Sequence, residues 1–164
     1  MDPKSLVPFL LFLHVMGAII AFGPTYAYSI MGAAAAREPQ HANFSSRQVA
    51  LIGRSLVYPL AIIQGVTGLL LIWATGISLM ASQWLTIAIV LYVILLAYAF
   101  TVQRNTLHRI IELGTPPPGT PPGPPAGGPP PELLANVKKV QRGGMFLGGL
   151  IVIIVFLMVV KPTF

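Results

Sequence analysis

The chain has 164 residues, of which 55% are hydrophobic and 9% charged, and its formal net charge is +6. Soluble domains carry about 25% charged residues, so this composition excludes an ordinary soluble domain. Cysteine is absent, which excludes disulfides, thiolate nucleophiles, iron–sulfur clusters and cysteine-based zinc sites. The basic residues form no aromatic-interleaved patch or nucleic-acid-binding motif, so we expect no nucleic-acid partner.

Four apolar runs have the length of a membrane-spanning helix, which needs about 20 residues. Lipid satisfies no backbone hydrogen bond, and the runs lack the alternation of a barrel strand, so helices are expected. The sequence predicts an all-α fold, a polytopic transmembrane four-helix bundle that forms one domain over residues 1–164. We expect the first helix to be retained, because its apolar run is longer than a typical signal core. The predicted helices cover residues 6–32, 46–76, 83–112 and 133–160.

The distribution of Lys and Arg predicts the orientation of the four helices. Only Lys4 and Lys161 fall on the side that holds both termini and the second loop. Basic residues are enriched in cytoplasmic segments, so we expect both termini outside and the first and third loops in the cytoplasm. Among the basic residues, Lys138, Lys139 and Arg142 are also expected to contact anionic lipid headgroups. The residues on the opposite side are Arg37, Arg47, Arg54, Arg104, Arg109, Lys138, Lys139 and Arg142.

Two prolines lie inside the predicted helices. Pro24 cannot donate a backbone hydrogen bond, which frees the carbonyl of Ile20 and predicts a kink. Both a static kink and a moving hinge fit this position, and we prefer the static kink. Pro59 predicts a second kink, within about one turn of the point where helix two enters lipid.

The loops predict cytoplasmic extensions of the helices. Helix two is expected to begin before the membrane, with Asn43 or Ser45 as its cap. The short second loop predicts that helices two and three are antiparallel neighbours. Residues 114–131 hold ten of the sixteen prolines and predict a polyproline II tether of at most about 56 Å between two helical stalks. Its PxxP spacings leave open a docking motif and a chance consequence of composition.

His14 is the one histidine expected inside the membrane, and it begins a stripe of small or polar residues on helix one. Gln64 and Thr67 on helix two, with Tyr92 on helix three, are expected at a similar depth. In one interpretation His14 hydrogen-bonds to Gln64 or Tyr92 and fixes helix packing, for roughly 0.6 kcal/mol. In the other, His14 is an axial haem ligand beside a flat small-residue face. The small residues of this predicted packing face are Gly17, Ala18, Ala21, Gly65 and Gly68.

Helix four carries little polarity within its apolar run. Its Gly144 and Gly148 form a small-xxx-small pair, which allows another helix to approach closely. We therefore expect helix four to face lipid or a partner subunit. The four carboxylates all lie outside the predicted membrane segments, which weakens an ion-coupled transporter and provides no catalytic pair. They are Asp2, Glu38, Glu112 and Glu132.

The segment LHVMGAIIAFGPTYAYSIMGAAAAREPQHANFSSR, with LVYPLAIIQGVTGLLLIW and WLTIAIVLYVILLAYAF, carries a resemblance. It resembles an uncharacterised family of four-helix bacterial predicted integral membrane proteins. That resemblance implies a multi-pass protein of a bacterial inner (plasma) membrane. More distantly, LHVMGAIIAFG resembles the first helix of the copper-resistance D type and of the haem-b-binding membrane protoporphyrinogen oxidases. The distant resemblance implies a haem role for His14 alone, and Ile19 and Ile20 stand where the oxidases carry a Trp.

These features leave three functional hypotheses. The preferred one is a non-enzymatic accessory or scaffold subunit of a larger membrane assembly, with membrane lipids and other subunits as partners. The second is a haem-b protein of redox or haem metabolism, with His14 as ligand. The third is a small transporter or channel, which rests on the polytopic topology and the kink at Pro24.

Overall fold

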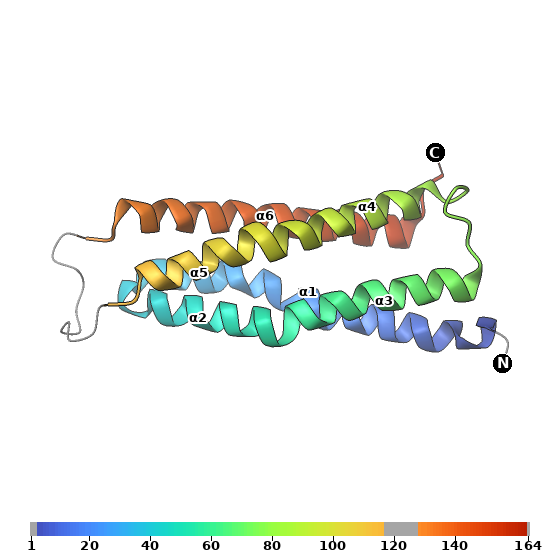
Figure 1. The fold of residues 1–164 in the computed structure, drawn as a ribbon, viewed down its shortest axis with the longest axis horizontal. Coiled ribbons are helices and arrows are strands. Elements are labelled where there is room, and N and C mark those ends of the chain that lie inside the picture. Colours follow the sequence, from blue (N-terminus) through green and yellow to red (C-terminus); the bar gives the residue numbers. More distant parts are fainter. Residues whose placement is uncertain (1–2, 117–127, 164) are drawn as a thin grey trace.

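The computed structural model describes residues 3–116 and 128–163, and the regular elements within these ranges are all helical. They form four long helical rods that lie side by side, as Figure 1 shows. The rods are Pro3–Arg37, Pro39–Thr75, Gln83–Leu113 and Pro131–Val160. Each rod is long and apolar enough to cross a membrane. The predicted all-α, polytopic four-helix fold is thus confirmed. The elements are η1 (Pro3–Leu6), α1 (Val7–Arg37), η2 (Pro39–His41), α2 (Ala42–Ile52), η3 (Gly53–Val57), α3 (Tyr58–Thr75), α4 (Gln83–Tyr98), η4 (Ala99–Gln103), α5 (Arg104–Leu113) and α6 (Pro131–Val160).

The distribution of side chains is that of a protein surrounded by lipid. Large aliphatic residues remain uncovered, for example Ile30 at 73% and Val159 at 75% exposure. Small and polar residues are buried instead, among them Ala21, Ala88 and Gln64. A soluble monomer rarely exposes apolar surface on this scale, whereas hydrocarbon covers it without cost. Burial therefore supports the assignment of the four rods to a membrane.

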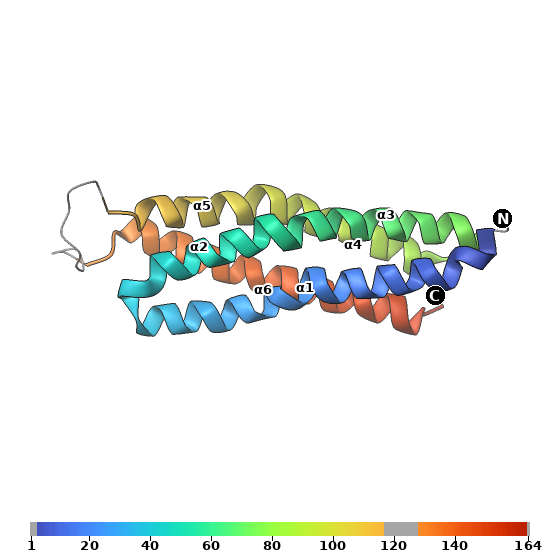
Figure 2. The same ribbon diagram turned by 90° about the horizontal axis from the view of Figure 1, so that it is seen from below.

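The bundle has two distinct ends. The terminal end holds η1, residues 76–82 and the chain after α6, and the loop end holds η2 and the start of α6 (Figure 1). Near the terminal end α1 packs on α3 and α4 packs on α6, while toward the loop end α5 packs on both α2 and α6. Helices α1 and α6 cross near their middles and separate toward both ends, as Figures 1 and 2 show.

Helices α3 and α4 are antiparallel and pack mainly on other helices. The predicted second and third spans are nevertheless neighbours, because α2 packs on α5. Residues 76–82 are long enough to bridge two helix pairs, since an extended chain covers about 3.3 Å per residue. Near the middle of the bundle α3 meets the turn η4, where the Tyr58 and Phe100 rings lie 4.9 Å apart. There the Tyr92 hydroxyl also donates a hydrogen bond to the Ala61 carbonyl.

The helices extend beyond the predicted membrane segments. Helix α1 continues to Arg37 through four consecutive alanines and ends before Pro39, because the residue preceding a proline disfavours helix. Helix α2 begins at Ala42, and neither Asn43 nor Ser45 caps it with a side-chain hydrogen bond. The tether prediction for residues 114–131 falls largely on residues 117–127, which lie outside the described part of the chain.

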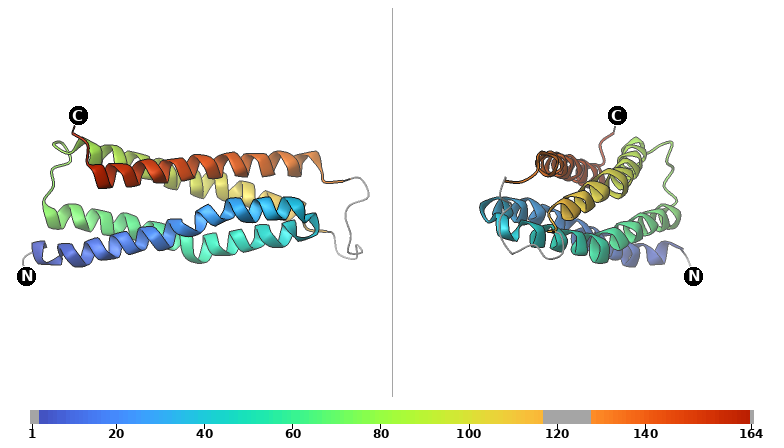
Figure 3. Two further views of the ribbon diagram at one scale, coloured as in Figure 1. Left: turned by 180° about the vertical axis from the view of Figure 1, so that it is seen from behind. Right: turned by 60° about the vertical axis from the view of Figure 1, so that its left-hand side comes forward.

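The two intrahelical prolines behave differently. Helix α1 passes through Pro24 and bends near its middle (Figure 3), while the Thr25 hydroxyl donates to the Phe22 carbonyl at 2.5 Å. Pro59 lies two residues after the end of the π-helical turn η3, a wider turn that accommodates its missing N–H. A second π-helical turn, η4, contains no proline and had no signal in the sequence.

Candidate functional site

The α1–α3 interface brings His14 into contact with two polar residues of α3. The Nδ1 atom of His14 lies 2.9 Å from the Thr67 hydroxyl, and its Nε2 atom lies 3.1 Å from the Gln64 side-chain nitrogen. Gln64 and Thr67 are one turn apart on α3, so both face the same point of α1. Both are buried, at 6% and 7% exposure. The three residues are called the polar cluster below.

The directions of these hydrogen bonds follow from the single proton of each hydroxyl. Thr67 donates its hydroxyl proton to the Gln64 backbone carbonyl at 3.0 Å, so the same oxygen must accept from His14. His14 therefore carries its proton on Nδ1, which leaves Nε2 as an acceptor for the Gln64 amide N–H. The imidazole is neutral, and both of its nitrogens are satisfied by α3.

One atom of the polar cluster lacks a partner. The side-chain oxygen of Gln64 is buried without a hydrogen bond from any described residue. It lies 2.8 Å from the position that a Cβ on Gly17 would occupy, so glycine at this position makes room for the amide. An unsatisfied buried acceptor costs roughly 1–3 kcal/mol of folding free energy, so this oxygen destabilises the interface.

The other predicted small residues also lie against polar or aromatic side chains. A Cβ on Gly68 would lie 3.2 Å from Cε1 of His14, and a Cβ on Gly65 would lie 3.3 Å from Cε1 of Tyr92. Ala21 is fully buried in the bundle and Ala18 is half-buried on the same helix. These small residues accommodate side chains from the facing helix.

Tyr92 lies beside the polar cluster without joining it. Its hydroxyl donates to the Ala61 carbonyl of α3, and no hydrogen bond connects it to His14 among the described residues. Tyr92 thus anchors α4 to α3, whereas His14 anchors α1 to α3. Two separate polar links therefore converge on α3.

The polar cluster does not fit a haem or metal site. Both ring nitrogens of His14 are engaged by Gln64 and Thr67, so a metal could bind only after one of these hydrogen bonds broke. Among residues 3–116 and 128–163, no three His, Asp or Glu side chains are grouped as metal ligands. His41 lies in η2 and His108 in α5, both toward the loop end.

A tight contact between α4 and α6 was not predicted from the sequence. Gly143 is buried, and a Cβ there would lie 2.8 Å from the Tyr98 hydroxyl and overlap the Gln103 amide oxygen. The Gln103 amide donates to the Val140 carbonyl at 3.1 Å, and the Tyr98 ring meets Phe146 edge to face at 5.1 Å. The adjacent glycines 143 and 144 were a possible signal, but helix periodicity alone does not show which of them is buried.

The predicted glycine pair of α6 has a more open environment. A Cβ on Gly144 would have only the Gln103 amide nitrogen within 4.0 Å, and one on Gly148 only Cε1 of Tyr26. Gly149, which the sequence analysis did not single out, has nothing within 4 Å. The surface of α6 is thus open at Gly149 as well as beside the Gly144–Gly148 pair.

Polar contacts at the loop end join the helical extensions. The Asn43 amide donates to the Ile111 carbonyl at 3.0 Å, which connects α2 to α5. Arg109 of α5 pairs with Glu132 of α6 at 2.8 Å on the surface. The three cations assigned to lipid headgroups are all exposed along α6: Lys138, Lys139 and Arg142.

A sequence model of one protein family covers almost the whole chain. The family is described as "Predicted integral membrane protein (DUF2269)", and its model matches residues 8–162. The match does not support the more distant resemblance to the copper-resistance and protoporphyrinogen oxidase families. No curated protein and no solved structure matches the chain.

Proposed function

Because the chain belongs to the DUF2269 family of predicted integral membrane proteins, we propose a role for it within the membrane, as an accessory or scaffold subunit of a larger assembly. Four helices can span the bilayer, and the polar side chains between them are used to hold the bundle together. A neutral histidine with both nitrogens satisfied supports packing rather than chemistry. The proposed function is accordingly non-enzymatic.

The observation that carries this proposal is the open face of α6. Met145, Val152 and Phe156 are 70%, 57% and 56% exposed, and the uncovered Gly149 lies among them. Their spacing places them on one side of the helix. In lipid, helix association depends on close packing, and small residues at the interface allow the backbones to approach. A partner helix can therefore pack across Gly149 between the larger side chains.

The proposed orientation places both termini outside the cell and the loop end in the cytoplasm of a bacterium, with the chain in the inner membrane. It is supported by the eight Lys and Arg residues of segments 37–54, 104–109 and 138–142, against two at the terminal end. The partner face of α6 would then lie within the bilayer, accessible to another membrane subunit.

The partner face can be tested by cross-linking. Because the chain has no cysteine, Val152→Cys provides a single reactive site on the open face of α6. In intact membranes a bismaleimide should join this site to a different membrane protein. Gly149→Leu should abolish the product, whereas Gly32→Leu, at a glycine of α1 that also has nothing within 4 Å, should leave it unchanged. A monomer, or a product containing only two copies of this chain, would refute the accessory role.

The two other hypotheses have their own tests. Haem binding predicts a Soret band after expression with ample haem, and this band should vanish in His14→Ala. The hydrogen bonds of His14 argue against that result. Transport predicts solute flux into liposomes above that of empty vesicles.

A further inference from the structure

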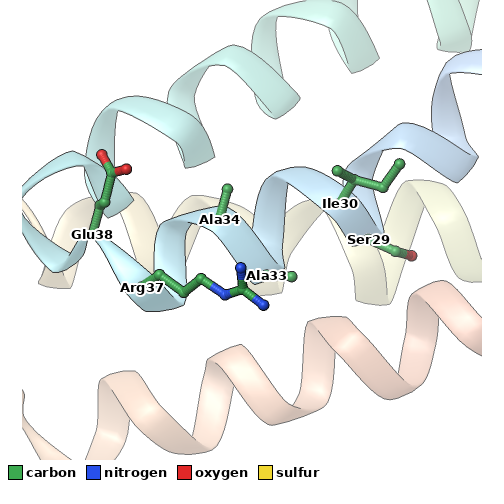
Figure 4. A pocket seen from close by; sticks show the side chains of 6 residues that line it. All are labelled: Ser29, Ile30, Ala33, Ala34, Arg37 and Glu38. Atoms are coloured by element: carbon green, nitrogen blue, oxygen red, sulfur yellow. The ribbon is translucent and has the colours of Figure 1, made fainter.

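A hollow of about 530 Å³ runs along the last turns of α1 at the loop end. It is lined by Ser29, Ile30, Ala33, Ala34, Arg37 and Glu38 (Figure 4). The three lining residues nearest the middle of α1 are apolar or small, and the charged residues lie at the far end. The hollow is therefore amphipathic along the helix axis, as the surface of a membrane interface is.

Arg37 is available to a ligand in this hollow. Its side chain extends back along α1 over Ala33, toward the middle of the helix, as Figure 4 shows. It makes no hydrogen bond or ion pair with any residue in 3–116 or 128–163. The one acidic lining residue, Glu38, lies beyond Arg37 and is 3.8 Å from the exposed His41 ring. The guanidinium thus faces the hollow, and no carboxylate of the described residues pairs with it.

The hollow lies at the depth of lipid headgroups. The hydrocarbon core takes about 20 residues of helix, so a span that starts at Val7 leaves the core near Tyr26. The headgroup region adds about 5–8 Å, or roughly four or five residues at 1.5 Å each. Ile30 lies within that layer, and the backward course of the Arg37 side chain returns its guanidinium toward it.

Two cations of α6 lie at the same depth along the bundle as this hollow. Gly148 of α6 lies beside Tyr26 of α1, and the two helices are antiparallel. Counting equal numbers of residues from this contact sets Arg142 level with Gly32 and Lys138 level with a point next to Arg37. Both α6 cations are exposed. Arg142 and Lys138 therefore lie at about the same depth as the hollow, and positive charge at this depth favours a phosphate on Arg37.

We propose that this hollow binds an anionic phospholipid of the leaflet at the loop end, with its phosphate on Arg37 and an acyl chain that passes Ile30 toward the hydrocarbon core. The Ser29 hydroxyl provides a further donor within the same hollow. A zwitterionic lipid is disfavoured, because the positive charge at this depth would repel its ammonium group. This site is separate from the partner face of α6, so the two proposals can fail independently.

The test uses the full-length protein in phosphatidylcholine vesicles that contain phosphatidylglycerol with a photoactivatable acyl chain. Peptide mapping should find the cross-link in residues 29–38, and unlabelled phosphatidylglycerol should compete better than phosphatidylcholine. Arg37→Gln should reduce this labelling by about fivefold, which corresponds to roughly 1 kcal/mol for one interfacial cation. Ala33→Leu, which fills the hollow at constant charge, should reduce it as well.

Arg54→Gln is the matched control, because it removes an exposed arginine of η3 that does not line the hollow. It should leave the labelling of residues 29–38 unchanged. Equal reductions in Arg37→Gln and Arg54→Gln would reduce the effect to general charge attraction and overturn the site. Equal labelling by phosphatidylglycerol and phosphatidylcholine probes would overturn it too.

Discussion

Gln64 of α3 places its side-chain oxygen 2.8 Å from the point where Gly17 of α1 would carry a Cβ. The amide occupies this space because its nitrogen donates to His14 on the same face of α1. Gly17 is thus required by a polar side chain on the opposite helix. This pair determines how closely α1 and α3 can approach around the polar cluster.

Gly17→Ala should destabilise the bundle by about 1–3 kcal/mol, the usual cost of extra volume in a packed interior. The added methyl would displace the Gln64 amide and weaken its hydrogen bond to His14. Thermal unfolding in detergent, followed by Trp fluorescence, measures the effect. Gly32→Ala is the control, since a Cβ there also meets nothing within 4 Å and should be neutral or slightly stabilising. Equal melting temperatures for the two variants would contradict the packing described for Gly17.

The hydrogen bond between His14 and Thr67 should appear as a coupling free energy. Each single variant, His14→Ala and Thr67→Val, loses that bond, so the double variant should lose less than their sum. Measured couplings between membrane helices average about 0.6 kcal/mol and reach about 1.7 kcal/mol. A double-mutant cycle on unfolding in detergent provides the value. Strict additivity would show that the two side chains do not interact.

Gly143→Ala should loosen the contact between α4 and α6. The new methyl would overlap the Gln103 amide and the Tyr98 hydroxyl, and a cost of about 1–3 kcal/mol is expected. Gly149→Ala, six residues along the same helix, should cost nothing measurable because its Cβ position is open. Unfolding of the two variants side by side in the same detergent tests the difference. Destabilisation by Gly149→Ala alone would mean that α6 presents its opposite face to α4.

Asn43→Ala should free the start of α2 from α5. The lost hydrogen bond to the Ile111 carbonyl is expected to contribute about 0.5–1.5 kcal/mol. Hydrogen exchange of the α2 amides should accelerate, while that of α3 stays unchanged. Asn136→Ala removes an amide that bonds within its own helix, to the Glu132 carbonyl, and should leave α2 exchange as it is. Unchanged, slow exchange of the α2 amides in Asn43→Ala would show that this hydrogen bond does not hold α2 to α5.

The sequence carried enough information for the fold and for the histidine's surroundings, for physical reasons. Hydrophobic runs of membrane length determine the number of spans, and helical spacing places His14 level with Gln64. The choice of Thr67 as second partner depends on side-chain rotamers, which spacing does not fix. The contact of Gly143 with Tyr98 depends on the crossing of α4 and α6, which only the packed bundle determines.

Other differences have local causes. Ser45 and Asn43 both have the chemistry of a helix cap, yet the bundle uses Asn43 to reach α5. The spans on either side of residues 76–82 are neighbours as predicted, but they pack on each other mostly through α2 and α5, because seven residues are enough to separate the start of α4 from the end of α3. The π-helical turn η4 contains no proline that would predict it from the sequence, whereas η3 ends two residues before Pro59.

The most direct test of the proposed membrane topology determines which side of the membrane each end of the bundle faces. Single cysteines at Ser78 and Thr163 mark the terminal end, and cysteines at Gln40 and Ala135 mark the loop end; all four positions are exposed. In intact cells a membrane-impermeant maleimide should label the first pair and spare the second until the cells are opened. Labelling of Gln40 or Ala135 in intact cells, or protection of Ser78 and Thr163, would contradict four membrane crossings with the basic segments in the cytoplasm.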